Sequence, residues 1–170
     1  MAINGHMKVV NNLSYQIRQM SQSDLPSVYK LVQNTLQVSY RAVYPAEAID
    51  FFKNYHQKEN ILKESLSGYT ILVETAEAII ATGTLLDTNI TRVFVHPNFQ
   101  RKGIGKLVAM DLIRKAERGA VTILELDASL VSTKFWESMG FIIARANFIP
   151  LKNNKKLIYY EMSKKLRYNL

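Results

Sequence analysis

Residues 92–106, RVFVHPNFQRKGIGK, are the part of the sequence that decides the fold. They begin with a run of β-branched and aromatic side chains, turn at Pro97, and continue into a loop that contains Gly103 and Gly105. From residue 104 to residue 118, apolar side chains then recur at helical spacing. The stretch therefore predicts a strand, a turn, a glycine-containing loop and the start of a helix.

A helix that begins at such a loop is a favourable site for phosphate groups. The first backbone N–H groups of a helix lack intrahelical partners and carry the positive end of the helix dipole. Gly103 and Gly105 have no Cβ, so the backbone there can approach an anion closely. Arg101, Lys102 and Lys106 add positive charge. Together these residues predict a diphosphate-binding site.

Other phosphate motifs fit the stretch less well. A Walker A loop needs Ser or Thr after Gly-Lys, but Lys106 is followed by Leu107. A dinucleotide fingerprint needs a third glycine where Val108 stands, although Glu125 lies about 20 residues further on, as the ribose-binding acid of that motif does. The simplest alternative is a structural turn followed by a basic helix start.

The rest of the chain predicts alternating strands and helices in the order β-α-α-β-β-β-α-β-α-β-β. Period-two or continuous apolar runs predict strands at residues 15–20, 69–74, 79–86, 90–95, 121–126, 141–149 and 157–162. Apolar residues at helical spacing predict helices at residues 25–40, 45–66, 104–118 and 132–139. Short connections in the first half predict antiparallel hairpins, and the second half contains a β-α-β crossover. We expect an α/β (α+β) fold with a mixed, mostly antiparallel sheet flanked by helices on both faces.

Length and composition indicate one globular domain. The chain has 170 residues, and we assign residues 8–170 to a single domain. Residues 1–7 contain Gly-His-Met and are interpreted as a cloning remnant or a disordered N-terminus. The sequence has no long apolar run, so we expect neither a membrane span nor a secretion signal.

The cysteine and histidine content and the net charge exclude several classes of protein. There is no cysteine, which excludes disulfides and thiolate metal sites and fits a reducing cytoplasm. His6, His56 and His96 are widely spaced, so no metal is expected. The formal net charge of +8 attracts anions, including nucleic acid. No helix-turn-helix, zinc or RNP-type signature accompanies that charge, so a nucleic-acid partner is not expected.

The loop also resembles a known family motif. Gln100–Gly105, QRKGIG, is similar to the acyl-CoA motif of the GNAT superfamily of N-acetyltransferases. Residues 126–141, LDASLVSTKFWESMGF, resemble the second cofactor segment of that family, and residues 159–162 resemble its last strand. The match runs in order from Tyr15, and two linked motifs are more specific than either alone. The resemblance implies acetyl-CoA-dependent transfer of an acetyl group to a primary amine of a small molecule or peptide, by an enzyme that often forms a homodimer.

The resemblance also implies which residues hold acetyl-CoA. The backbone of the strand before the loop should pair with the pantetheine arm, and the loop N–H groups should hold the pyrophosphate. The implied cofactor residues are Phe94, Val95, Gln100, Arg101, Lys102, Gly103, Ile104, Gly105, Lys106, Ser129, Ser132, Lys134 and Phe135. For Phe135, packing in the core is an equal alternative.

The catalytic residues are harder to assign, because Trp136 stands where the family often has a tyrosine general acid. An indole N–H does not titrate usefully, so Trp136 cannot act as the general acid. A catalytically weak module that binds or senses acyl-CoA is therefore the alternative function. Asp87 lies where relatives place a water-linked base, or else is a turn residue. His56 has a suitable ordinary pKa, or else is a surface or packing residue. Tyr160 is the third candidate; it alternates with Tyr159 on the last strand, so only one of the two can face a cleft.

The acceptor amine should be held by the first helices. Tyr40 and Tyr44 are candidates for the walls of its pocket, and Glu47 and Asp50 for attracting a cationic amine. A mixed helix surface explains these residues equally well. Polyamines, amino acids, drug-like amines and protein N-termini all remain open as acceptors.

Overall fold

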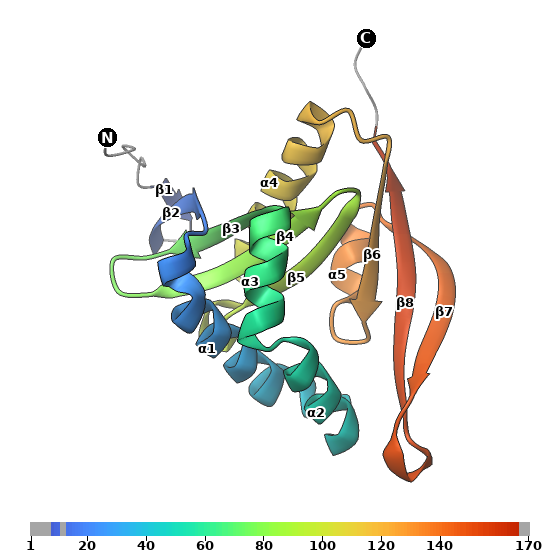
Figure 1. Ribbon diagram of the computed structural model, residues 1–170. Coiled ribbons are helices and arrows are strands. Elements are labelled where there is room, and N and C mark those ends of the chain that lie inside the picture. Colours follow the sequence, from blue (N-terminus) through green and yellow to red (C-terminus); the bar gives the residue numbers. More distant parts are fainter. Residues whose placement is uncertain (1–7, 11–12, 167–170) are drawn as a thin grey trace.

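A computed structural model describes residues 8–10 and 13–166 of the chain, which form one mixed sheet covered by helices (Figure 1). The strands are β1 (Lys8–Val10), β2 (Leu13–Gln19), β3 (Tyr69–Glu74), β4 (Ile79–Leu86), β5 (Asn89–Val95), β6 (Ile123–Ser129), β7 (Ile142–Pro150) and β8 (Lys156–Lys165). The α-helices are α1 (Leu25–Thr35), α2 (Ala46–Tyr55), α3 (Lys58–Ser67), α4 (Ile104–Arg118) and α5 (Thr133–Ser138). None of the described helices is long and apolar enough to cross a membrane.

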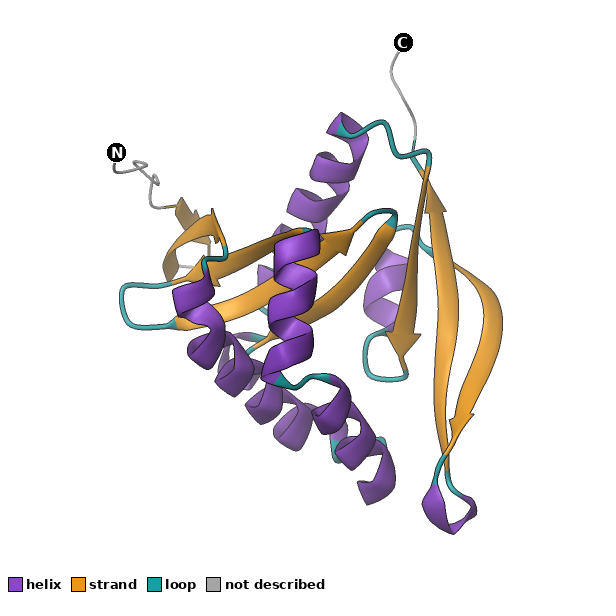
Figure 2. Cartoon of the chain, in the orientation of Figure 1, coloured by secondary structure: helices purple, strands orange, loops and turns teal. Residues whose placement is uncertain are grey.

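The strand order across the sheet is β1-β2-β3-β4-β5-β6-β8-β7. Every neighbouring pair is antiparallel except β5 and β6, which are parallel and are joined by α4. Helices α1, α2 and α3 cover one face, and α4 and α5 lie on the other (Figure 2). The predicted mixed, mostly antiparallel sheet with helices on both faces is therefore confirmed.

Details of the predicted element order differ from the structure. The single helix expected at residues 45–66 is two helices, because His56 and Gln57 leave the helical conformation between α2 and α3. The first helix ends at Thr35 and continues as a π-helical turn over Leu36–Tyr40. Strand β1 had not been predicted.

Helix α4 fixes the region that contains the predicted phosphate loop. Ile104, Val108, Leu112 and Ala116 form its apolar stripe and are almost fully buried against the sheet. Burying one such Leu or Val side chain contributes about 1.5–3 kcal/mol, so the stripe holds the N-terminus of α4 firmly against β4 and β5.

Candidate active site

The parallel strands β5 and β6 separate soon after they meet. Their register contains one pair, Asn89 and Glu125, supported by a 3.0 Å hydrogen bond from the Glu125 N–H to the Thr88 carbonyl. Beyond this pair the facing edges of the two strands are not joined to each other. Such an edge offers backbone N–H and C=O groups to an extended ligand.

A β-bulge lies on β5 at this opening. Arg92 and Val93 stand opposite the single residue Gly83 of β4, and Arg92 has a φ of 56°. A Cβ at Gly83 would lie 2.5 Å from Cγ1 of Val108, so glycine lets α4 pack closely here. Bulges redirect the backbone and are common beside active sites.

The side chain of Arg92 ties the bulge to the helices above it. It is 2% exposed, and its Nη2 lies 2.7 Å from Oε1 of Glu64 in an ion pair whose geometry is not that of a hydrogen bond. The Nε of Arg92 and the hydroxyl of Thr91 both donate to Oε2 of Glu64. Arg92 Nη1 also donates to Nδ1 of His56. The bulge is thereby fixed to α3 and to the end of α2.

His56, one of the predicted catalytic candidates, is buried in this cluster. Burial and the guanidinium of Arg92 lower the pKa of His56 to about 3. The ring is therefore neutral at pH 7, which is consistent with Nδ1 accepting a hydrogen bond. A base with so low a pKa holds a proton poorly, so the structure does not favour His56 as the general base.

The predicted phosphate loop closes onto the start of α4. Gly103 precedes the helix with a φ of 83°, and Arg101 also has a positive φ, of 61°. The side-chain amide of Gln100 donates to Ser39 Oγ and to the Val95 carbonyl, each at 3.0 Å. The loop is thus held at the end of β5, with the first N–H groups of α4 directed along its axis.

Phe135 lies close to Gly105 in the first turn of α4. A Cβ added at Gly105 would contact its ring at 3.5 Å and Val95 Cγ2 at 3.6 Å. The Phe135 ring is partly buried against the core and packs edge-on to Trp136, with ring centroids 4.9 Å apart. Phe135 therefore packs against the core, at a position that borders the loop.

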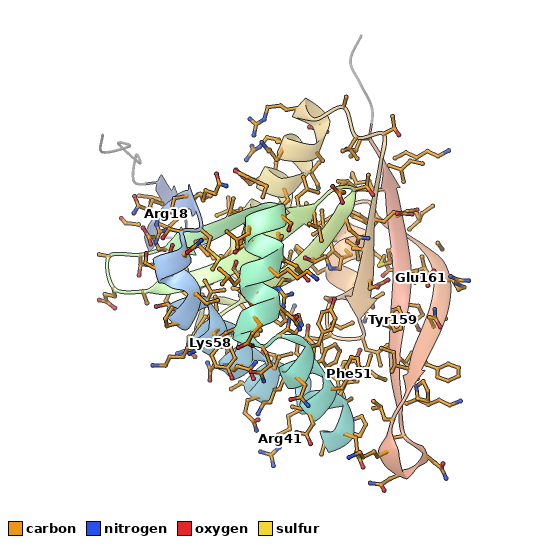
Figure 3. All side chains as sticks on the ribbon, viewed as in Figure 1. Arg18, Arg41, Phe51, Lys58, Tyr159 and Glu161 are labelled. Atoms are coloured by element: carbon orange, nitrogen blue, oxygen red, sulfur yellow. The ribbon has the colours of Figure 1, made fainter. Side chains whose placement is uncertain are left out.

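A cavity of about 250 Å³ lies in the opening between β5 and β6. Aromatic side chains of α2 form one wall and β8 forms another; Phe51 and Tyr159 lie on these two sides (Figure 3). The lining residues are Tyr40, Phe51, Phe52, Tyr55, His56, Ile90–Phe94, Leu126, Asp127, Ser129, Ser132, Trp136, Ile149, Leu157 and Tyr159. The cavity therefore reaches both the bulge and the helix that carries Trp136.

Several predicted site residues meet in this cavity: Tyr40, His56, Phe94, Ser129 and Ser132 all line it. They come from four separate parts of the chain, and the sheet opening brings them together.

The other candidates lie elsewhere. Asp87 is exposed in the two-residue turn between β4 and β5, with a φ of 52°. Tyr160 packs with the core on the α4 side, whereas its neighbour Tyr159 lines the cavity. Tyr44 is buried beside the cavity, where its hydroxyl donates to the Ile158 carbonyl and accepts from the Leu130 N–H, both at 2.8 Å.

The two acids proposed to attract an amine also lie outside the lining. Glu47 accepts a 2.9 Å hydrogen bond from Asn153, and Asp50 is exposed on α2. Neither of them borders the cavity.

Asp127 is a cavity residue that the sequence analysis missed. It is the acidic residue among the lining side chains, and it is the register partner of Glu161 across β6 and β8. Arg145 neutralises Glu161 at 2.8 Å, but no cation of the described residues lies within ion-pair distance of Asp127. Asp127 is an exposed residue, but partial desolvation of its carboxylate first, and then the carboxylates of Glu161 and Glu125, raise its pKa. A raised pKa makes a carboxylate a better proton acceptor.

Comparison with known proteins agrees with this geometry. The model of the acetyltransferase (GNAT) domain matches residues 40–166, well over half of the chain. The chain belongs to the GNAT family of acetyltransferases. It is therefore an N-acetyltransferase, as the resemblance implied.

Individual relatives support the fold and the chemistry. The [ribosomal protein bS18]-alanine N-acetyltransferase of Salmonella typhimurium is 29% identical over 136 residues, which cover 77% of this chain and 84% of the relative. A GCN5-related N-acetyltransferase structure from Rhodopseudomonas palustris has a TM-score of 0.82 at 16% identity, covering 95% of this chain and 98% of its own. The PaiA N-acetyltransferase of Thermoplasma acidophilum, solved with coenzyme A, has a TM-score of 0.72 at 17% identity, with coverages of 91% and 100%. At these identities the two structures show the shared fold.

Proposed function

We propose that this GNAT chain transfers the acetyl group of acetyl-CoA to the α-amine of a polypeptide N-terminus. The observation that carries the proposal is the opening between β5 and β6, which joins the loop at the α4 N-terminus to the cavity beside the bulge. A donor lying along the open edge of β5 would have its phosphates at one end and its reactive end at the other. Such an enzyme would work in the cytoplasm.

The residues present fit acetyl-CoA. The α4 N-terminus supplies N–H groups, Gly103 supplies a left-handed turn, and Arg101, Lys102 and Lys106 supply charge. Acetyl-CoA brings an acetyl group activated as a thioester. The bulge turns the β5 backbone toward the opening, where an N–H can stabilise negative charge that develops on the carbonyl oxygen.

On the acceptor side, we assign Asp127 to the amine. An ammonium ion must lose a proton before its nitrogen can attack. Asp127 is the acidic group of the lining, it has no cation partner among the described residues, and its raised pKa suits proton acceptance. The aromatic ring of Tyr159 also lines the cavity and can contact a cationic amine by its face.

Two observations favour a polypeptide acceptor. The Salmonella relative is named for acetylation of a protein alanine. The cavity volume of about 250 Å³ lies below the about 300–1,000 Å³ of pockets that enclose drug-sized ligands, so it suits one small terminal residue whose chain continues outward.

Trp136 favours one alternative, an acyl-CoA sensor without turnover. Its side chain is 5% exposed and packs against Phe135 and Phe141, with no hydroxyl to protonate a leaving thiolate. A sensor would bind acetyl-CoA and transfer nothing.

The test is a thiol-release assay with acetyl-CoA and a panel of acceptors. The panel contains peptides with free N-terminal Ala, Ser or Met, the same peptides with blocked N-termini, polyamines, and free amino acids. We expect release with free N-termini and none with blocked ones. Turnover only with polyamines or amino acids would contradict the polypeptide assignment, and acetyl-CoA binding with no turnover would establish the sensor.

A further inference from the structure

The cavity contains a connected set of hydroxyl groups near Trp136. Ser132 lies one turn before Trp136 on the same helix, and its carbonyl accepts the Trp136 N–H at 3.1 Å. Ser132 Oγ lies 3.1 Å from Ser129 Oγ, and Ser129 Oγ donates to the Tyr40 hydroxyl at 3.2 Å. All of these residues line the cavity. A hydroxyl chain therefore joins the helix that carries Trp136 to the π-helical turn that carries Tyr40.

The direction of these hydrogen bonds leaves one proton for a ligand. Because Ser129 donates to the Tyr40 oxygen, the O–H of Tyr40 is available to another acceptor. Tyr40 is only 8% exposed but lines the cavity, and its hydroxyl lies 3.2 Å from the hydroxyl of Ser129, which is also a lining residue.

The ring of Tyr40 is fixed by its aromatic neighbours. It lies edge-on to Phe52 at 5.1 Å, stacks on Tyr44 at 5.9 Å, and is 6.1 Å from Phe94 on β5, all measured between ring centroids. The contact with Phe94 places Tyr40 beside the strand along which the donor should lie. Burial raises the pKa of Tyr40, opposed by the hydrogen bond from Ser129, so the phenol is protonated at neutral pH.

We propose that Tyr40 is the general acid of this enzyme and replaces the tyrosine that the family often places at the position of Trp136. This inference rests on the proposed acetyl transfer. In the step, the amine has already given its ammonium proton to Asp127; its nitrogen forms a bond to the acetyl carbon and loses a second proton to solvent, while the carbon–sulfur bond breaks. The sulfur keeps the electron pair of that bond and takes the Tyr40 proton, and the hydrogen bond from Ser129 stabilises the phenolate until solvent returns a proton.

The first test is a set of variants with a rescue. Tyr40→Phe should lower kcat by about 10²–10⁴-fold, the usual contribution of general acid–base catalysis, with little change in the Kd of acetyl-CoA. Trp136→Tyr added to Tyr40→Phe should recover activity, because it restores a phenol at the family position. Trp136→Phe in the same background has the same packing loss but no hydroxyl, so it should recover none. Tyr29→Phe is the matched control, since Tyr29 lies outside the cavity on α1.

A second readout does not depend on turnover. The Tyr40 O–H should donate to the thiolate of bound CoA, so wild type should bind CoA more tightly at about pH 9 than at pH 7, relative to desulfo-CoA. Tyr40→Phe should lose this difference. Ser129→Ala, which removes the hydroxyl that supports Tyr40, should reduce it.

The outcomes separate this inference from the proposed function. Wild-type turnover that is unchanged in Tyr40→Phe would overturn the general-acid role and leave the acetyl transfer standing. Equal recovery by Trp136→Tyr and Trp136→Phe would also overturn the role, because packing would explain both. No wild-type turnover with any amine would refute the proposed function, and the inference with it.

Discussion

Replacing Glu64 by Gln tests the link between the helices and the active-site bulge. Arg92 is 2% exposed in its side chain and Glu64 17%, and their closest atoms are 2.7 Å apart. Glu64→Gln leaves the charge of Arg92 buried without its counter-charge, which costs about 3–5 kcal/mol in comparable buried pairs. Because Glu64 is partly exposed and Gln can still accept a hydrogen bond, we expect a loss near the low end, about 3 kcal/mol.

The loss is measurable by urea denaturation, followed by the fluorescence of Trp136. Trp136 is the one tryptophan of the chain and is buried, so its emission reports global unfolding. Glu59→Gln is the matched control: it lies on the same helix, is exposed, and should change the unfolding free energy by less than about 0.5 kcal/mol. A loss below about 1 kcal/mol for Glu64→Gln would refute the reasoning, because exposed ion pairs contribute no more than that.

Three further predictions concern the loop, the amine site and the buried histidine. Gly103→Val should weaken acetyl-CoA affinity in calorimetry by about tenfold, or 1.4 kcal/mol, because a β-branched residue resists a φ of 83°. Gly119→Ala, at the other end of α4, is the control and should leave the affinity unchanged. Equal acetyl-CoA affinities of Gly103→Val and wild type would count against the loop as the binding site. Asp127→Asn should lower kcat/KM for the amine by about 10²–10⁴-fold with an unchanged acetyl-CoA Kd. A larger effect of Asp87→Asn would instead favour Asp87 as the base. Since the pKa of His56 is lowered to about 3, the unfolded state binds the extra proton between that pH and about 6.5, so stability should fall as pH drops through this range. His56→Gln should remove up to about 1.4 kcal/mol per pH unit of that slope in urea titrations, and an unchanged slope would contradict the assignment.

The turn and helix start of the predicted cofactor loop could be predicted from the sequence because their signals are local. A glycine at a left-handed φ, a helix start and basic neighbours all fall between Gln100 and Lys106, and each has its own sequence preference. The same holds for the apolar stripe of α4 and the alternation of the strands. The resemblance to the GNAT family rests on the two motifs at residues 100–105 and 126–141.

The acceptor side could not be predicted, because tertiary contacts create it. The sequence around His56, between Tyr55 and Gln57, gives no signal of burial, yet His56 is buried against Arg92, 36 positions further on. The positive φ of Arg92 has no residue-type signal, since arginine has no preference for that region. Only the register of β5 with β4 shows that the bulge lies there.

The strand residues show a second limit. Alternation predicts that one of Tyr159 and Tyr160 faces the cleft, but the register of β6 with β8 decides that Tyr159 does. Asp127 is missed for the same reason: it is an exposed carboxylate on a strand, and only the position of β6 beside the opening shows that it lines the cavity. Its signal was available as the period-two partner of Ser129.

The most direct test of acetyl transfer is mass spectrometry of a peptide with a free N-terminal alanine after incubation with acetyl-CoA and the purified protein. We predict a mass increase of one acetyl group located on the α-amine, with stoichiometric release of CoA, and none when the N-terminus is blocked. A peptide that stays unmodified while acetyl-CoA binds tightly would contradict polypeptide acetylation. If no amine in the panel were acetylated, the acetyl-transfer account itself would be contradicted.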